Sequence, residues 1–128
     1  MSVKMLHTCI RVKNLEASLK FYKDAFNLIE TRRKDVKEAK FTLVYIAPKE
    51  GDYEIELTYN YDKEHNYEIG NGFSHIAVGT PNIEEMRKKH ITLGYKVTEL
   101  KGLANSPANY YFVTDPDGYQ IEVIRTNE

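Results

Sequence analysis

The sequence predicts an α+β fold made of two β-α-β-β-β modules. Two observations lead to this prediction. His7 and His75 each stand in a strand-like run, and each is followed seven residues later by an asparagine that opens a helical stretch. Each half also ends in the same alternating pentad, "YEIEL" at 53–57 and "YQIEV" at 119–123. Because these features recur in the same order, we interpret the chain as an internal repeat of one module.

The first repeat, at about 1–60, reads as a strand, a helix and three further strands. Asn14 is a favoured helix N-cap, because its side chain satisfies a backbone donor at the helix start. Apolar residues then recur at helical spacing, at Leu15, Leu19, Tyr22 and Phe26. Strand-like runs follow at about 28–33, 41–47 and 53–59.

The second repeat, at about 73–126, has the same order of elements. Asn82 opens its helix, and Glu85 stands where a capping box places an acid. Ile83, Met86 and Leu93 form the apolar stripe, and Gly94 is a C-terminal stop signal. Strands are expected at 95–100, 109–114 and 119–125, and the polar stretch 61–72 is expected to link the repeats.

Composition and charge narrow the range of functions. A chain of 128 residues suits one domain, which we assign to residues 1–128. A net charge of −1 gives no broad attraction to nucleic acid or to an anionic membrane. No apolar stretch reaches membrane-spanning length, and the N-terminus lacks a signal-peptide core. Cys9 is the single cysteine, which excludes an intrachain disulfide and fits a cytoplasmic location.

Each repeat offers one histidine on its first strand and one glutamate on its last. Side chains alternate along a strand, so Glu56 and Glu122 lie on the face opposite the apolar residues of their pentads. Two imidazoles and two carboxylates suit Zn, Ni, Co, Mn or Fe(II). Taken singly, a strand histidine is usually a hydrogen-bonded core or surface residue and a strand glutamate usually faces solvent. It is the repetition that favours a metal site. His65 and His90 have no counterpart and are interpreted as structural or surface residues.

Two further side chains are expected on the faces that carry the candidate ligands. Arg11 stands four residues after His7, and Asn60 stands four residues after Glu56. Arginine binds carboxylates through two parallel hydrogen bonds, and asparagine offers both a donor and an acceptor. The alternative is that Arg11 pairs with a neighbouring acid. The functional interpretation is a site for a substrate with a carboxylate distant from the reacting centre.

The sequence resembles the glyoxalase I (lactoylglutathione lyase) family of the vicinal oxygen chelate superfamily. The matching motifs follow the order of the family over nearly the whole chain. They are "MLHTCIRV" (5–12), "LEASLKFYKDAF" (15–26), "IELTYNY" (55–61), "SHIAV" (74–78) and "DPDGYQIEVI" (115–124).

The resemblance implies a metal site and a partner. His7, Glu56, His75 and Glu122 would bind one divalent metal. The protein would be a homodimer with shared sites, in which one chain supplies the first pair of ligands and the other chain the second. The compact chain looks more like the bacterial type activated by Ni²⁺ or Co²⁺, although the ligands also suit Zn²⁺.

The resemblance also implies a reaction. Methylglyoxal and glutathione combine without an enzyme to a hemithioacetal, which the family isomerises to S-lactoylglutathione. Glu122 would be the main base, and Glu56 would serve the other enantiomer. Arg11 and Asn60 match residues that hold glutathione in the family.

The sequence departs from the family in two places. The stretch at 101–111 is a loop rich in Gly, Asn, Ser and Pro, in which Lys101 is a candidate contact for the glutathione carboxylate. Asn71 stands where some relatives carry an arginine that binds glutathione, so a different thiol is possible.

Four further functions occur on this fold, namely a thiol transferase acting on an epoxide, an extradiol dioxygenase, an epimerase and a non-catalytic binding relative. Glu56 as a fourth ligand argues against these four functions.

Overall fold

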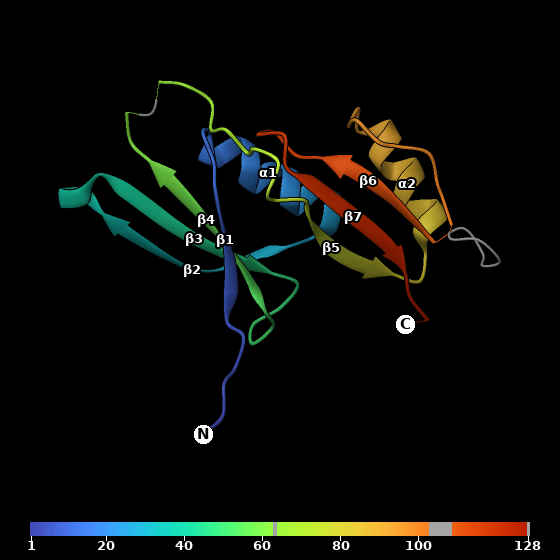
Figure 1. Ribbon diagram of the computed structural model, residues 1–128, viewed down its shortest axis with the longest axis horizontal. Coiled ribbons are helices and arrows are strands. Elements are labelled where there is room, and N and C mark those ends of the chain that lie inside the picture. The colour runs from blue at the N-terminus through green and yellow to red at the C-terminus, as the bar shows by residue number, and fades with distance from the viewer. Residues whose placement is uncertain (63, 103–108, 128) are drawn as a thin grey trace. The chain divides into compact units, whose positions relative to one another are not determined.

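The chain forms two compact units, Met1–Glu68 and Ile69–Glu128. The structure is a computed structural model that describes residues 1–62, 64–102 and 109–127 (Figure 1). The boundary between the units falls inside the polar stretch that the sequence predicts as a linker. Each unit combines one α-helix with one mixed β-sheet, so the predicted α+β class is confirmed.

The first unit is a four-stranded sheet in the order β1-β4-β3-β2. The first strand runs parallel to β4, and the other pairs are antiparallel. The pairing therefore brings the first and the last strand of the unit side by side. The elements are β1 (His7–Arg11), α1 (Leu15–Phe26), β2 (Ile29–Val36), the short 3₁₀ helix η1 (Lys37–Ala39), β3 (Phe41–Ala47) and β4 (Glu54–Asn60).

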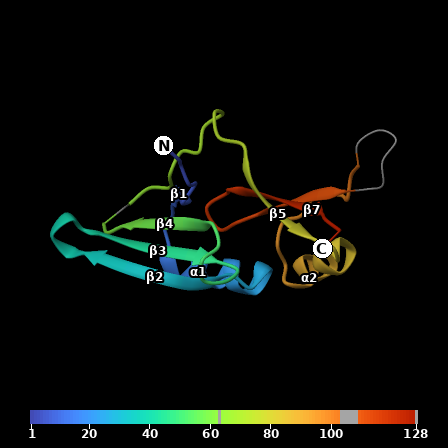
Figure 2. The ribbon, with the colours of Figure 1, turned by 90° about the horizontal axis from the view of Figure 1, so that it is seen from below.

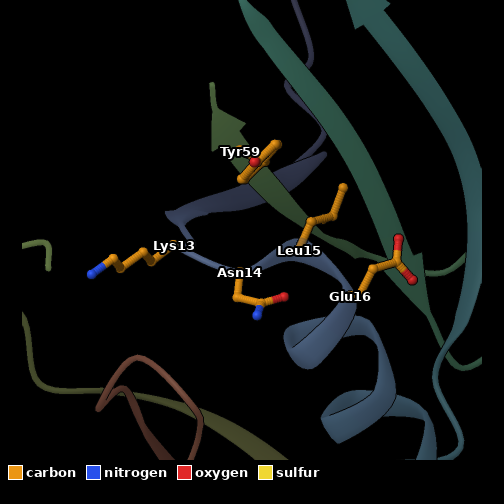
Figure 3. A pocket seen from close by; sticks show the side chains of 5 residues that line it. All are labelled: Lys13, Asn14, Leu15, Glu16 and Tyr59. Carbon is orange, nitrogen blue, oxygen red and sulfur yellow. The ribbon is translucent and has the colours of Figure 1, made fainter. Parts of the chain in front are cut away.

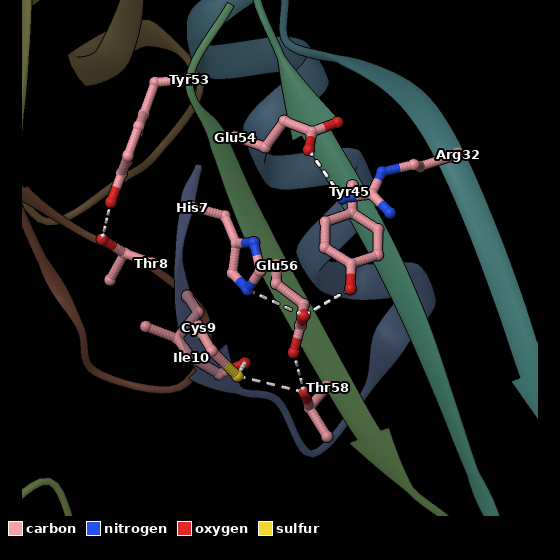
Figure 4. A network of polar contacts seen from close by, with 10 residues as sticks. All are labelled: His7, Thr8, Cys9, Ile10, Arg32, Tyr45, Tyr53, Glu54, Glu56 and Thr58. Atoms are coloured by element: carbon pink, nitrogen blue, oxygen red, sulfur yellow. Dashed lines mark hydrogen bonds and ion pairs between the residues drawn. The ribbon is translucent and has the colours of Figure 1, made fainter. Parts of the chain in front are cut away.

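The helix α1 begins where the sequence predicts. The Asn14 Oδ1 atom accepts a hydrogen bond from the Ala17 backbone N–H at 3.0 Å, as expected of an N-cap. The helix ends at Asn27, whose backbone is left-handed. Ile55 and Leu57, which flank Glu56 on β4 and point to the other face of the sheet, are buried. The helix α1 lies on one side of this sheet (Figure 2), and Figure 4 shows it behind the strands, opposite the side chains of Glu56 and Tyr45. The opposite face of the sheet is thus left for polar side chains.

The second unit is a three-stranded sheet in the order β5-β7-β6. Its first strand again runs parallel to its last, and β6 is antiparallel to β7. The helix α2 packs on β6 and β7. The elements are β5 (His75–Thr80), α2 (Ile83–Thr92), β6 (Tyr110–Thr114) and β7 (Gln120–Arg125). Neither helix within the described ranges is long and apolar enough to cross a membrane.

The predicted strand at 95–100 is wrong. This segment makes only one isolated bridge to β6, at Val97, and Lys101 just after it makes another. Thr98 explains the interruption. Its hydroxyl, rather than a backbone carbonyl, accepts the Phe112 N–H at 2.9 Å, and its own carbonyl accepts Arg87 Nε at 3.0 Å. A side chain thus occupies the place of a ladder hydrogen bond.

The capping box predicted at Asn82 is also wrong. Asn82 does occupy the N-cap position of α2, but its side chain makes no capping hydrogen bond within the described residues. Instead, its backbone N–H donates to the Thr80 hydroxyl at 3.2 Å. The helix ends as predicted, with Leu93 at the C-cap and Gly94 at a φ of +85°, a conformation that glycine adopts without strain.

Candidate metal centre

The first candidate ligand pair forms because β1 and β4 are parallel neighbours. Their register sets Cys9 opposite Glu56 and His7 opposite Glu54, so His7 and Glu56 are offset by two residues on one face. The His7 Nε2 atom lies 3.2 Å from Glu56 Oε2 (Figure 4). The His7 side chain is 31% exposed and the Glu56 side chain 13%. The pair is therefore open to a ligand from the imidazole side.

The second pair repeats this geometry in the other unit. Along β5 and β7, Ala77 stands opposite Glu122 and His75 stands opposite Gln120, which is the same offset. The His75 Nε2 atom lies 3.1 Å from Glu122 Oε1. The two sheets, whose sequences are only partly alike, thus form the same contact between an imidazole and a carboxylate. Repetition of this kind argues against a chance ion pair.

The carboxylate of Glu56 is held at both oxygens. The Tyr45 hydroxyl donates to Oε2 at 2.5 Å, and the Thr58 hydroxyl donates to Oε1 at 3.1 Å (Figure 4). Burial by itself would raise the pKa of Glu56. Hydrogen bonds from Tyr45, Cys9 and Thr58 and the charge of His7 outweigh burial and lower this pKa. Glu56 is therefore a carboxylate, and a donor for a cation, at neutral pH.

Sequence reasoning missed two residues of this cluster. Cys9 lies between His7 and Arg11 on the same strand face, so the two-residue period would have found it. Its sulfur lies 3.1 Å from the Thr58 hydroxyl, and burial raises the pKa of the Cys9 thiol. Tyr45 lies in the continuous apolar run of β3, where no alternation marks the polar face.

The residues of each pair fit a divalent metal. Both histidines turn Nε2 toward a carboxylate oxygen, and nitrogen and oxygen donors of this kind suit Ni²⁺, Co²⁺ and Zn²⁺. The His75 Nδ1 atom is 2.7 Å from the Ser74 hydroxyl, the type of contact that orients a metal-binding imidazole. No three His, Cys, Asp or Glu side chains in the described part of the chain gather into a ready-made metal cluster. Each pair is thus half of the predicted ligand set.

The three residues predicted to contact the substrate have different surroundings. Arg11 is exposed at the end of β1, on the strand face that carries His7. The Asn60 side chain donates to the Tyr67 hydroxyl at 2.9 Å. Lys101 belongs to the second unit, where its backbone pairs with Tyr110 and its side chain is exposed. Within the predicted loop at 101–111, residues 103–108 lie outside the described residues.

An open hollow at the start of α1 is not the candidate site. It is lined by Lys13, Asn14, Leu15, Glu16 and Tyr59, none of which is a predicted ligand (Figure 3). Lys13 and Glu16 point away from each other, so their charges do not converge on a common point (Figure 3). Asn14 is already engaged as the N-cap of the helix.

Comparison with known proteins places the chain among glyoxalases. Several bacterial relatives match over nearly their whole length. The chain is 40% identical over 126 residues to a Synechocystis protein named "Probable lactoylglutathione lyase", with coverage of 96% of this chain and 95% of the relative. It is 37% identical to the lactoylglutathione lyase of Neisseria meningitidis serogroup B, with coverage of 96% and 91%.

Solved structures agree with the sequence matches. The trypanothione-dependent glyoxalase I of Leishmania major aligns with a TM-score of 0.85 at 33% identity, covering 97% of this chain and 87% of that chain. Glyoxalase I from Zea mays aligns with a TM-score of 0.87 at 31% identity, covering 98% and 45%. The fosfomycin resistance protein FosX of Listeria monocytogenes, at 18% identity and a TM-score of 0.70, shares the fold. The family pattern described as Glyoxalase/Bleomycin resistance protein/Dioxygenase superfamily matches residues 4–123, and the chain belongs to this superfamily.

Proposed function

We propose that the chain is a lactoylglutathione lyase, a glyoxalase I that isomerises the hemithioacetal of methylglyoxal and glutathione to S-lactoylglutathione. The observation that carries the proposal is the His–Glu contact repeated in both units, at 3.2 Å between His7 and Glu56 and at 3.1 Å between His75 and Glu122. The relatives named lactoylglutathione lyase, which match over nearly the full chain, support the same reaction.

The four residues of the two pairs would hold one divalent metal. We infer a homodimer in which one chain supplies His7 and Glu56 and its partner supplies His75 and Glu122. When bound, the metal would act as a Lewis acid that stabilises negative charge on the oxygens of the substrate. Ni²⁺ and Co²⁺ are the favoured ions, and the donor set also suits Zn²⁺.

The isomerisation moves one proton between adjacent carbons. In the proposed reaction, the Glu122 carboxylate takes the proton from the carbon that bears sulfur and returns it to the neighbouring carbon. The hydroxyl proton passes to the second oxygen, so the former aldehyde carbon becomes the thioester carbonyl. Atoms and electrons balance without any other reactant. Base catalysis of this kind contributes about 10²–10⁴-fold to the rate, and Glu56 would serve the opposite enantiomer.

Three residues are proposed to bind the thiol part of the substrate. Arg11 is supported by its exposure on the ligand-bearing face of β1. Asn60 would exchange its contact with Tyr67 for a substrate amide. Lys101 is supported only by its exposed side chain in the second unit. Because one similar structure is a trypanothione-dependent enzyme, both glutathione and trypanothione belong in the assay.

The test is reconstitution of metal-stripped protein. The protein is reloaded separately with Ni²⁺, Co²⁺, Mn²⁺ and Zn²⁺, and thioester formation from methylglyoxal and each thiol is followed. His7→Ala and His75→Ala should lose metal and activity together, whereas His65→Ala, in the polar stretch between the repeats, should keep both. Tight metal binding without thioester formation from either thiol would reject the reaction, and activity that is independent of both histidines would reject the site.

A further inference from the structure

The two candidate carboxylates stand at equivalent positions but in different surroundings. In the first unit, the residue of β3 that pairs with Glu56 is Tyr45. In the second unit, the residue that pairs with Glu122 is Phe112. Both aromatic rings meet the neighbouring ligand histidine edge-on, with centroid distances of 5.3 Å in the first unit and 5.4 Å in the second. The hydroxyl group is thus the main difference between the two aromatic positions.

The hydroxyl of Tyr45 is held rigidly on Glu56. The Arg32 guanidinium carbon lies 3.6 Å from the centre of the Tyr45 ring, and the same guanidinium bonds Glu54 at 3.0 Å (Figure 4). Tyr45 is only 7% exposed. The Tyr45 hydroxyl donates to Glu56 Oε2 at 2.5 Å. A clamped donor restricts the orientations that the Glu56 carboxylate can adopt.

Glu122 has no comparable restraint. Phe112 offers no hydroxyl, and Ile124 stands two residues after Glu122, where Thr58 follows Glu56. Ala77 is opposite Glu122, in the position that Cys9 holds opposite Glu56. Among the residues whose placement is described, the one polar partner of the Glu122 side chain is His75.

We propose that Tyr45 is a positioning residue that fixes Glu56 as a metal-binding carboxylate, and that Phe112 leaves Glu122 free to move. This inference rests on the proposed function. A base that shuttles a proton between two carbons must change its direction, whereas a ligand that holds a cation benefits from a fixed one. The hydroxyl on only one of two equivalent rings would therefore divide the roles of ligand and base between two otherwise similar glutamates.

The first arm of the test measures metal affinity. Tyr45→Phe keeps the ring, and with it the contacts to Arg32 and His7, but removes the donor to Glu56. We expect the dissociation constant for Ni²⁺, measured by competition with a chelator, to rise by about 10-fold, since groups that support a ligand contribute about 10–100-fold. Tyr53→Phe is the matched control, because its hydroxyl bonds Thr8 at 2.7 Å and not a ligand. Equal affinities for Tyr45→Phe and the control would overturn the proposal.

The second arm measures the opposite change in the other unit. Phe112→Tyr should bring a hydroxyl beside Glu122. We expect kcat to fall by about 10-fold while the affinity for Ni²⁺ stays the same or improves, because the added hydroxyl would restrain Glu122, which favours its role as a ligand and hinders its role as the base. Unchanged kcat in a folded Phe112→Tyr protein would overturn the division of roles.

Failure of this inference can be told apart from failure of the proposed function. Metal affinity and the visible spectrum of the Co²⁺ protein report on the support of Glu56 without any substrate. If the wild-type protein forms no thioester but Tyr45→Phe still weakens metal binding against Tyr53→Phe, the positioning role stands and the reaction is wrong. If wild-type activity is present and neither arm responds, the reaction stands and the positioning role is wrong.

Discussion

Tyr111→Phe is expected to destabilise the second unit by an amount set by one buried hydrogen bond. The Tyr111 hydroxyl lies 2.8 Å from His90 Nδ1, and both residues are 0% exposed. Burial raises the pKa of Tyr111, so the hydroxyl stays protonated under all ordinary conditions. The substitution keeps the ring and removes only the oxygen.

The magnitude follows from the burial of both partners. Loss of the hydroxyl deprives His90 Nδ1 of this contact at a place that water does not reach. A buried polar atom that loses its partner costs about 1–3 kcal/mol. We therefore expect the free energy of unfolding to fall by about 1–3 kcal/mol, with the m-value unchanged.

Urea unfolding of the metal-free protein, followed by circular dichroism, measures this change. Tyr110→Phe is the matched control. Tyr110 is the neighbouring residue on β6, and its hydroxyl has no hydrogen bond to any residue in the described ranges. We expect this control to change stability by less than about 0.5 kcal/mol. Equal effects of the two substitutions would refute the reasoning, because the buried hydrogen bond would then contribute nothing of its own.

Four more substitutions test three separate features. Glu122→Gln should lower kcat by about 10²–10⁴-fold. It should change the unfolding free energy by less than about 1 kcal/mol, because glutamine has nearly the same shape and keeps an oxygen that can accept a hydrogen bond beside His75. Near-normal turnover would exclude the role of Glu122 as base. Asn14→Ala should lower the free energy of unfolding, measured by thermal unfolding, by about 0.5–2 kcal/mol. Asn82→Ala should lower it much less, because the Asn82 side chain makes no capping hydrogen bond within the described residues. Equal losses for the two variants would contradict the difference between the caps. The hydrogen bond from Arg125 lowers the pKa of Glu84 in the folded protein. This pair therefore stabilises the fold at pH values above about 4.3, the pKa of a glutamate in the unfolded chain. The contribution disappears as the pH falls through the lower pKa of the folded protein. Glu84→Gln should thus destabilise at pH 7 and have no effect at about pH 2; a loss that is the same at both pH values would contradict the ion pair.

The two His–Glu contacts could be predicted from the sequence, but the residues that hold Glu56 in place could not. The two-residue period placed Glu56 and Glu122 on the polar face, and the repeat related them to His7 and His75. Which residue of β3 meets Glu56, and which residue of β6 meets Glu122, depends on the register between neighbouring strands. The run at Phe41–Ala47 is apolar on both faces, so nothing in it marks Tyr45 as a contact of Glu56.

The errors in secondary structure also have local causes. The alternating run at 95–100 looks like a strand, but the hydroxyl of Thr98 takes a hydrogen bond that a regular ladder needs. Asn82 has the residue type of an N-cap, yet Thr80 binds its backbone instead. In both cases a side-chain oxygen competes with the expected partner, and composition and spacing contain no information on such competition.

The parallel pairing of the first strand with the last has a consequence for how each unit folds. The donors of a unit lie near the two ends of its chain, so they meet only after the long intervening segment has been closed into place, a step that is entropically costly and slow. A partly folded unit cannot present the pair. If the proposed metal site is correct, metal binding would be linked to completion of the whole unit, because both donors are in place only after the last strand has paired with the first.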